Sequence, residues 1–311
     1  MKLPGVVARR RGASLLVLAA VCLLPVFAAP RVWMPAPTYR YLLVLDVTQS
    51  MNVRDVEGAD GTRSRLHLGR EALLQVLAAM PCGSQVSVAL FAEGQTLPLF
   101  DPLEVCDHYP AMERVISGLQ WRMAWAGNSQ LDLGVVSALQ EARKQSLDLI
   151  FVSDGDQTPR RQASRLGTVQ AHSGTTRGWM VGVGSEQPRP VPKLDAQDRI
   201  VGYWEPHEAQ RQGFNPNFVV QGGGLSFAYA GETPAGTDEH LSALRQPELR
   251  DLARAAGLQY LRLTDPAALV VAARDPQLAI LADAPVDLRF VFGLAAALLL
   301  LCGWSLQDRA T

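Results

Sequence analysis

The sequence lacks an excess of charge of either sign. Its 311 residues include 29 Lys and Arg against 30 Asp and Glu, which gives a formal net charge of -1. Without a basic excess the chain has no bulk electrostatic attraction for nucleic acid, so we do not expect a nucleic-acid-binding function. A composition of 48% hydrophobic and 19% charged residues also excludes a disordered or collagen-like chain.

The chain also lacks the short motifs of the common enzyme classes. It contains no His-Glu-x-x-His, Gly-x-Ser-x-Gly, P-loop or dinucleotide-binding fingerprint, so no motif supports hydrolysis or nucleotide use. Histidine is scarce, and the five histidines are scattered without the spacing of metal ligands. We expect them in surface or loop positions.

Two long apolar stretches lie near the ends of the chain. Residues 12–30 follow three consecutive arginines, and residues 289–306 contain a run of alanines and leucines. A helix needs about 20 mostly apolar residues to cross a bilayer. We predict a transmembrane helix in each stretch, with residues 1–11 and 307–311 on the cytoplasmic side by the positive-inside rule.

The first stretch has a second interpretation, because Val26-Phe27-Ala28 resembles a signal-peptide cleavage point. We expect an uncleaved anchor, and the alternative is a signal peptide that is removed after export. The predicted location is the inner membrane of a bacterium. Residues 31–288 would then form a domain that faces the periplasm.

Cysteine is also scarce, with four residues in the chain. Cys22 and Cys302 fall within the apolar stretches, which leaves Cys82 and Cys106 as the pair in the exported part. An oxidising compartment favours a disulfide between these two residues. The alternative is two unrelated buried thiols.

The exported part alternates apolar strands with amphipathic helices. Strands are predicted at residues 41–45, 86–91, 147–152, 178–183 and 258–263, and helices at 66–77, 109–119, 130–142, 161–170 and 247–256. This alternation predicts an α/β fold with a doubly wound, mostly parallel sheet. A long, partly β-structured insertion is predicted at residues 185–240, where the alternation stops.

Polar residues stand where several of these elements begin or end. Asp46, Thr48 and Ser50 alternate after the first strand, so an extended segment would point their oxygens the same way. Ser129 precedes a predicted helix, and Asp154 follows the third strand. Ligands bind at the carboxyl ends of strands in open α/β sheets, and hard oxygen ligands suit Mg²⁺, Mn²⁺ or Ca²⁺. We predict that these five residues bind a divalent cation, with Mg²⁺ favoured.

Each of these residues also has a structural interpretation. Asp46 could form a local turn, Ser129 could cap a helix, and Asp154 could belong to an ordinary Asp-Gly turn. Their occurrence together and in order favours the ion. With only two carboxylates, the ion would keep positive charge and an open position for an acidic side chain of another molecule. Asp55 and Asp156 are expected in solvated turns, with hydrogen bonds to the site as the alternative.

The arrangement resembles a von Willebrand factor A domain and its metal-ion-dependent adhesion site. The resemblance is carried by Asp46-x-Thr48-x-Ser50, Gly127-x-Ser129 and Ser153-Asp154-Gly155. It implies the same fold and a divalent ion whose coordination a partner's carboxylate completes. Thr48 and Ser129 differ from the family's usual residues, but both keep a hydroxyl oxygen.

Such a domain between membrane helices is similar to the bacterial Bat-type and MxaL-type proteins associated with MoxR ATPases. The segments 46–55, 81–84, 104–106 and 121–125 carry this similarity. It implies an accessory role in the maturation or assembly of a periplasmic complex, with methanol dehydrogenase as the family's named client. The implied partners are other von Willebrand A membrane proteins and a MoxR-type ATPase.

We therefore predict a membrane-anchored binding protein that has no catalytic residues and is not an enzyme. Two alternatives stay open. The first is a haloacid-dehalogenase-like phosphatase, which also has an aspartate after its first strand but needs a second acid where Thr48 stands. The second is a scaffold whose metal site is vestigial.

Overall fold

The chain forms two structural units. Unit 1 comprises Met1–Thr38 and Ile280–Thr311, and unit 2 comprises Tyr39–Ala279. The computed structural model describes residues 5–28, 31–58, 61–125, 129–157, 163–205 and 240–308. The predicted metal site lies in unit 2.

A seven-stranded sheet forms the centre of unit 2, in the order β14-β9-β8-β2-β5-β6 with β7 paired to β5. The parallel strands are β2 (Arg40–Asp46), β5 (Gln85–Ala92), β8 (Asp148–Ser153), β9 (Gly178–Val183) and β14 (Gln259–Leu263). Two short strands, β6 (Gln95–Pro98) and β7 (Leu103–Glu104), run antiparallel to β5. The predicted strands are confirmed, and the sheet is mixed but mostly parallel.

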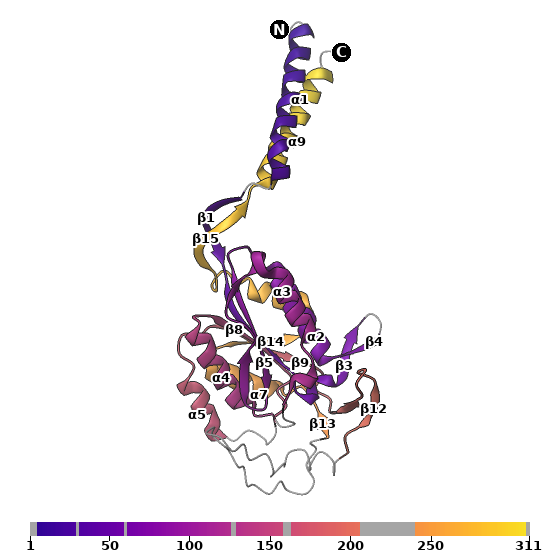
Figure 1. Ribbon diagram of the computed structural model, residues 1–311, viewed down its shortest axis with the longest axis vertical. Helices are drawn as coiled ribbons and strands as arrows, with labels where there is room; N and C mark the ends of the chain where they lie inside the picture. Colours follow the sequence, from indigo (N-terminus) through magenta and orange to yellow (C-terminus); the bar gives the residue numbers. More distant parts are fainter. Residues whose placement is uncertain are drawn as a thin grey trace. The chain divides into compact units, whose positions relative to one another are not determined.

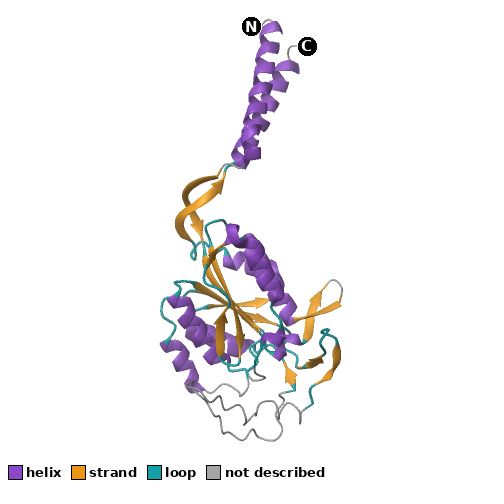
Figure 2. Ribbon diagram, viewed as in Figure 1, coloured by secondary structure: helices purple, strands orange, loops and turns teal. Residues whose placement is uncertain are grey.

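Helices cover both faces of this sheet (Figures 1 and 2). On one face lie α2 (Arg65–Ala79), α3 (Val105–Gly118) and α8 (Pro266–Ala273). On the other face lie α4 (Leu131–Lys144), α5 (Ala163–Ala171) and α7 (Gln246–Ala256). Side chains alternate between the faces of a strand, so Leu43 and Leu45 of β2 enter the first core and Leu42 and Val44 enter the second. This explains why β2 is apolar throughout.

Two elements of unit 2 follow the first strand and lead into α2. They are a 3-10 helix, η1 (Gln49–Asn52), and a hairpin of β3 (Arg54–Gly58) and β4 (Gly61–Ser64). Ser64 caps α2, because its hydroxyl accepts from His67 N at 3.2 Å. A second 3-10 helix, η2 (Trp121–Met123), lies between α3 and α4 in the chain.

The predicted insertion is partly β-structured where the structure describes it. It contains the short strands β10 (Arg189–Pro190), β11 (Pro192–Leu194) and β12 (Ile200–Tyr203), and β13 (Leu241–Ser242) follows it. β10 pairs with β13, and β11 pairs with β12, both antiparallel. Residues 206–239 of the predicted insertion lie outside the described residues.

Unit 1 contains two helices, α1 (Gly5–Ala28) and α9 (Arg289–Asp308), which lie side by side (Figure 1). It also contains a two-stranded ribbon of β1 (Arg31–Thr38) and β15 (Ile280–Asp287), paired antiparallel along their full lengths. The sequence analysis did not predict this ribbon.

The structure does not show the two predicted transmembrane helices. Among the described residues, no helix combines the length and the apolar character needed to cross a membrane.

Candidate metal centre

The predicted ligands lie at one edge of the sheet, where parallel strands end. β2 ends at Asp46, and β8 ends one residue before Asp154. β5 ends one residue before Glu93, which forms an isolated bridge with Ser129. Because β2 lies between β5 and β8, the three loops meet at neighbouring carboxyl ends, where open α/β sheets bind ligands.

The first loop brings its three oxygens together in a turn. The Thr48 hydroxyl donates to Asp46 Oδ1 at 2.6 Å and lies 3.2 Å from Ser50 Oγ. Thr48 itself is extended, but Ser50 belongs to η1. The prediction of a fully extended segment is therefore wrong. The turn closes on the Asp46 carboxylate, which also accepts from Thr48 N at 2.9 Å.

Asp46 is completely buried, and its second carboxylate oxygen accepts from the Ser153 hydroxyl at 2.7 Å. Burial, followed by the charge of Asp154, raises the pKa of Asp46 to about 7, although the hydrogen bonds from Thr48 and Ser153 act to lower it. Within the described part of the chain Asp46 forms hydrogen bonds but no ion pair. A buried carboxylate without a cationic partner is costly, so a cation beside it would be favourable.

Ser129 contributes a buried hydroxyl from the loop before α4. The residue is 7% exposed, and its Oγ has no hydrogen-bond partner among the described residues. The adjacent Gln130 N donates to the Glu93 carbonyl, which holds this loop against the end of β5. Gly127 and Asn128 lie outside the described residues. Because buried hydroxyls ordinarily have a partner, Ser129 Oγ is a candidate ligand.

The structure adds Arg65, the first residue of α2, which the sequence analysis did not consider. Its side chain is completely buried and forms ion pairs with Asp55 at 2.6 Å and Asp154 at 2.7 Å. Burial acts to lower the pKa of the Arg65 guanidinium, but the charges of Asp154 and Asp55 outweigh it and raise this pKa. No local sequence signal marks Arg65, because an arginine in the first turn of a helix is ordinarily solvated.

The two aspartates expected in solvated turns both lie at this edge. The Asp55 side chain is buried, and it accepts from Ser185 N at 3.0 Å as well as pairing with Arg65. The prediction of a solvated turn is therefore wrong for Asp55. Asp156 Oδ1 lies 3.7 Å from Arg245 Nε. Burial and the charge of Asp154 raise the pKa of Asp156 to about 6.

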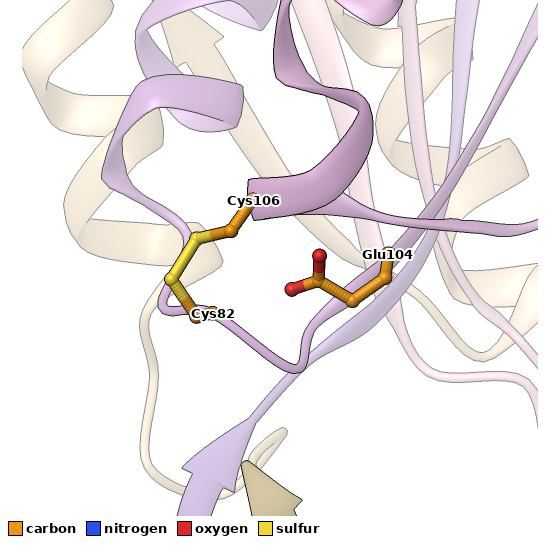
Figure 3. A group of neighbouring side chains, drawn as sticks. All are labelled: Cys82, Glu104 and Cys106. Carbon is orange, nitrogen blue, oxygen red and sulfur yellow. A yellow bond between two sulfur atoms is a disulfide. The ribbon is translucent and has the colours of Figure 1, made fainter. Parts of the chain in front are cut away.

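A second cluster in the described residues contains Cys82, Glu104 and Cys106 (Figure 3). The predicted disulfide between Cys82 and Cys106 is confirmed, with a Cα–Cα distance of 5.2 Å. The Glu104 carboxylate accepts from Gly83 N at 2.6 Å and from Asp107 N at 2.7 Å. Because the two sulfur atoms are bonded to each other, this cluster joins the turn before β5 to the start of α3 and is not an ion site.

Comparison with known protein families shows which family this part of the chain resembles. Residues 41–157 match the family described as von Willebrand factor type A domain. This part of the chain is similar to a von Willebrand factor type A domain. The match begins in β2 and ends beyond Asp154, so it includes all five predicted ligands and Arg65.

Two solved structures resemble the fold over most of its length. One is an aerotolerance-related membrane protein from Bacteroides fragilis, with a TM-score of 0.50 and 12% identity over 77% of this chain and 98% of that chain. The other is the conserved hypothetical protein BatB from Bacteroides thetaiotaomicron, with a TM-score of 0.50 and 12% identity over 76% of this chain and 96% of that chain. At this identity the likeness concerns the fold. No curated protein matches the chain.

The residues at the edge of the von Willebrand factor type A domain fit a divalent cation in two ways. Their oxygens are carboxylates and hydroxyls, which are the ligands of hard cations. Ser129 Oγ is buried without a hydrogen-bond partner among the described residues, and Asp46 is buried without a described ion pair. Each group would gain from contact with a cation.

Proposed function

We propose that this von Willebrand factor type A domain binds a divalent cation at the edge formed by β2, β5 and β8. Asp46, Thr48, Ser50 and Ser129 would hold the ion, with Asp154 beside them, and Mg²⁺ is the ion that the oxygen set favours. The observation that carries the proposal is the buried Ser129 hydroxyl, which has no hydrogen-bond partner within the described residues.

The domain would use this ion to bind an acidic side chain of a partner protein. Because Thr48, Ser50 and Ser129 are neutral, they do not cancel the charge of a dication. The ion would then supply an electrophilic position for a carboxylate oxygen of the partner. This chemistry is binding, and we propose a protein-interaction function in place of a catalytic one.

The proposed setting is an oxidising compartment such as the bacterial periplasm. The disulfide between Cys82 and Cys106 supports this setting, because disulfides persist outside the reducing cytosol. An accessory role in assembling a periplasmic complex, together with a MoxR-type ATPase, extends the proposal on the basis of the motif resemblance. A dehydrogenase of the methanol dehydrogenase type is the client that this resemblance names.

The experiment is a titration with Mn²⁺, in which electron paramagnetic resonance measures the free ion. The wild-type chain is expected to bind one Mn²⁺, and Asp46→Asn to bind none. Acetate should increase the affinity for Mn²⁺ by completing its coordination, whereas acetamide, which has no charge, should not. No binding by the wild type up to about 10 mM Mn²⁺, beyond the weakest affinities of extracellular cation sites, would overturn the proposal.

A further inference from the structure

We propose that Arg65 is a positioning residue that holds the Asp154 carboxylate, so that Asp46 and not Asp154 is the carboxylate in contact with an ion bound at this edge. The inference rests on the proposed function and assigns different roles to the two carboxylates predicted as ligands, Asp46 and Asp154. Asp46 would be the anionic ligand. Asp154 would orient Arg65 and the loop around it.

Both carboxylate oxygens of Asp154 already accept hydrogen bonds within the chain. Its Oδ2 accepts from Arg65 Nη1 at 2.7 Å and from Ser242 Oγ at 3.5 Å, and its Oδ1 accepts from Asp156 N at 3.0 Å. Ion pairs between fully buried groups are strong when hydrogen bonds satisfy their remaining atoms. Asp154 therefore has a cationic partner within the chain.

Arg65 is held in place from several elements. Asp55 accepts from both Nε and Nη2, at 3.1 and 2.6 Å, while Ser242 Oγ and its carbonyl accept at 2.7 and 3.2 Å. Gly184 has a φ of +114°, and a Cβ there would lie 2.5 Å from Arg65 Nε. The backbone after β9 thus packs directly against the guanidinium. This packing leaves Arg65 little freedom to move away from Asp154.

The carboxylates at this edge differ in their charge balance. Asp55 and Asp154 share Arg65, and Asp156 lies near Arg245. Asp46 has hydrogen bonds from Thr48 and Ser153 but no ion pair in the described part of the chain. A further cation at this edge would therefore stabilise Asp46 more than the carboxylates that already have a cationic neighbour.

Two consequences follow for an ion at this edge. The positive charge of Arg65 lowers the affinity for a dication, because like charges repel strongly where the effective dielectric constant is low. It also leaves the bound ion with more positive charge to offer an anionic partner. Ion binding and partner binding would therefore strengthen each other, and by linkage the effect is reciprocal.

The first test compares the two aspartates by Mn²⁺ titration of the full chain. Asp46→Asn is expected to abolish binding. Asp154→Asn should weaken binding by about tenfold without abolishing it, because a nearby negative charge is lost while the ligand Asp46 stays in place. An equal loss of affinity in both variants would overturn the inference and leave the proposed ion site standing.

The second test removes the positive charge of the Arg65 side chain. Arg65→Met should bind Mn²⁺ at least about tenfold more tightly than the wild type, because one nearby positive charge is gone. Arg65→Lys keeps the charge and should stay close to the wild type. Arg262→Met is the matched control, since Arg262 makes an exposed ion pair with Glu186 and its loss changes the net charge equally.

The outcomes separate the inference from the proposed function. Tighter binding in Arg65→Met but not in Arg262→Met supports both. Unchanged or weaker binding in a folded Arg65→Met, as judged by circular dichroism, overturns the inference alone. If Arg65→Met does not fold, the Asp154→Asn comparison decides. Absence of Mn²⁺ binding in the wild type and in every variant overturns both.

Discussion

At the scale of single residues, two buried serine hydroxyls, those of Ser153 and Ser129, have different surroundings. Ser153 Oγ donates to Asp46 at 2.7 Å and accepts from Gly155 N at 3.0 Å. Ser129 Oγ has no hydrogen-bond partner among the residues that the structure describes. A hydroxyl that already has partners stabilises the fold, whereas one without partners is available to a ligand.

Ser129→Ala and Ser153→Ala should therefore have opposite effects. Ser129→Ala is expected to change the free energy of unfolding by less than about 0.5 kcal/mol, because it removes no hydrogen bond within the described chain. It should weaken Mn²⁺ binding about tenfold or more, as loss of a ligand does. Ser153→Ala should cost about 1–3 kcal/mol, because it leaves a buried carboxylate oxygen without its donor. Chemical denaturation and Mn²⁺ titration measure the two effects, and equal stability losses would contradict the assignment.

The raised pKa of Asp46 predicts a pH dependence of stability when no divalent ion is present. Its pKa rises from an ordinary value of 3.8 to about 7. The folded state therefore holds a proton that the unfolded state has lost, and stability falls as the pH rises from about 4 to about 7. Thermal unfolding in a chelator should show the melting temperature decreasing over this range.

Asp46→Asn is the control for this pH dependence. The variant should show a flatter curve, with the remaining slope coming from Asp156, whose pKa is also raised. An identical slope in the wild type and in Asp46→Asn would show that another group titrates. Added Mg²⁺ should reduce the slope in the wild type, because a cation stabilises the ionised carboxylate.

At the scale of elements, the position of the Ser129 loop depends on how α4 packs against β5. Gly134 of α4 faces Phe91 of β5, and a Cβ at Gly134 would lie 2.1 Å from the Phe91 ring. Thr96 Oγ1 also donates to the Gly134 carbonyl at 3.0 Å, which ties α4 to β6. The close approach of helix and strand requires glycine here.

Gly134→Ala is expected to destabilise the fold by about 1–3 kcal/mol, because the added methyl group overpacks the core. Gly167 of α5 is the matched control, since a Cβ there has no atom within 4 Å. Gly167→Ala should be neutral or stabilising by up to about 1 kcal/mol, because alanine has the better helix propensity. Urea denaturation of both variants measures the difference. Similar effects at both positions would contradict the packing argument.

The disulfide joins two further elements, the turn before β5 and the start of α3. Cys82 and Cys106 are separated by 24 residues in the chain. On the chain-entropy account, closing a loop of this length stabilises the fold by about 3.5 kcal/mol. The double variant Cys82→Ser and Cys106→Ser should lose about this much free energy of unfolding. Glu104 would still cap α3 in this variant, so the fold should persist, and the loss should match that caused by reduction of the wild type.

At the scale of the whole molecule, the hydrophobic cores lie within unit 2. The two clusters of buried residues span from Tyr39 to Leu278 and cover both faces of the sheet. None of the described residues of unit 1 belongs to either cluster. Each unit therefore has its own stabilising contacts.

A chain shortened to residues 39–279 is expected to fold by itself. Its melting temperature should lie within about 4 °C of the full chain, which corresponds to less than about 1 kcal/mol in a domain of this size. Its Mn²⁺ affinity should be unchanged, because all the proposed ligands lie in unit 2. Calorimetry and Mn²⁺ titration measure both quantities. A loss of cooperative unfolding would show that unit 1 is required for the core.

Much of unit 2 could be predicted from the sequence. The strands at β2, β5 and β8 were predicted because buried parallel strands are continuously apolar, and the helices because their apolar positions repeat every three or four residues. The pairing of β1 with β15 was not predicted, since Thr38 and Ile280 are 242 residues apart. Such pairing depends on where the rest of the chain folds, which no local pattern records.

The candidate site could also be predicted only in part from the sequence. Asp46, Ser129 and Asp154 were found because residues at strand and helix ends can be located from local periodicity. Arg65 was missed, and Asp55 was expected in a solvated turn, because the pair from Arg65 to Asp154 spans 89 residues and the contact of Arg65 with Ser242 spans 177. The sequence by itself determined that Asp46 and Asp154 follow strands that end at one edge of the sheet. Only the tertiary structure decided which of them has a cationic partner, because Coulomb energy depends on distance through space and periodicity depends on distance along the chain.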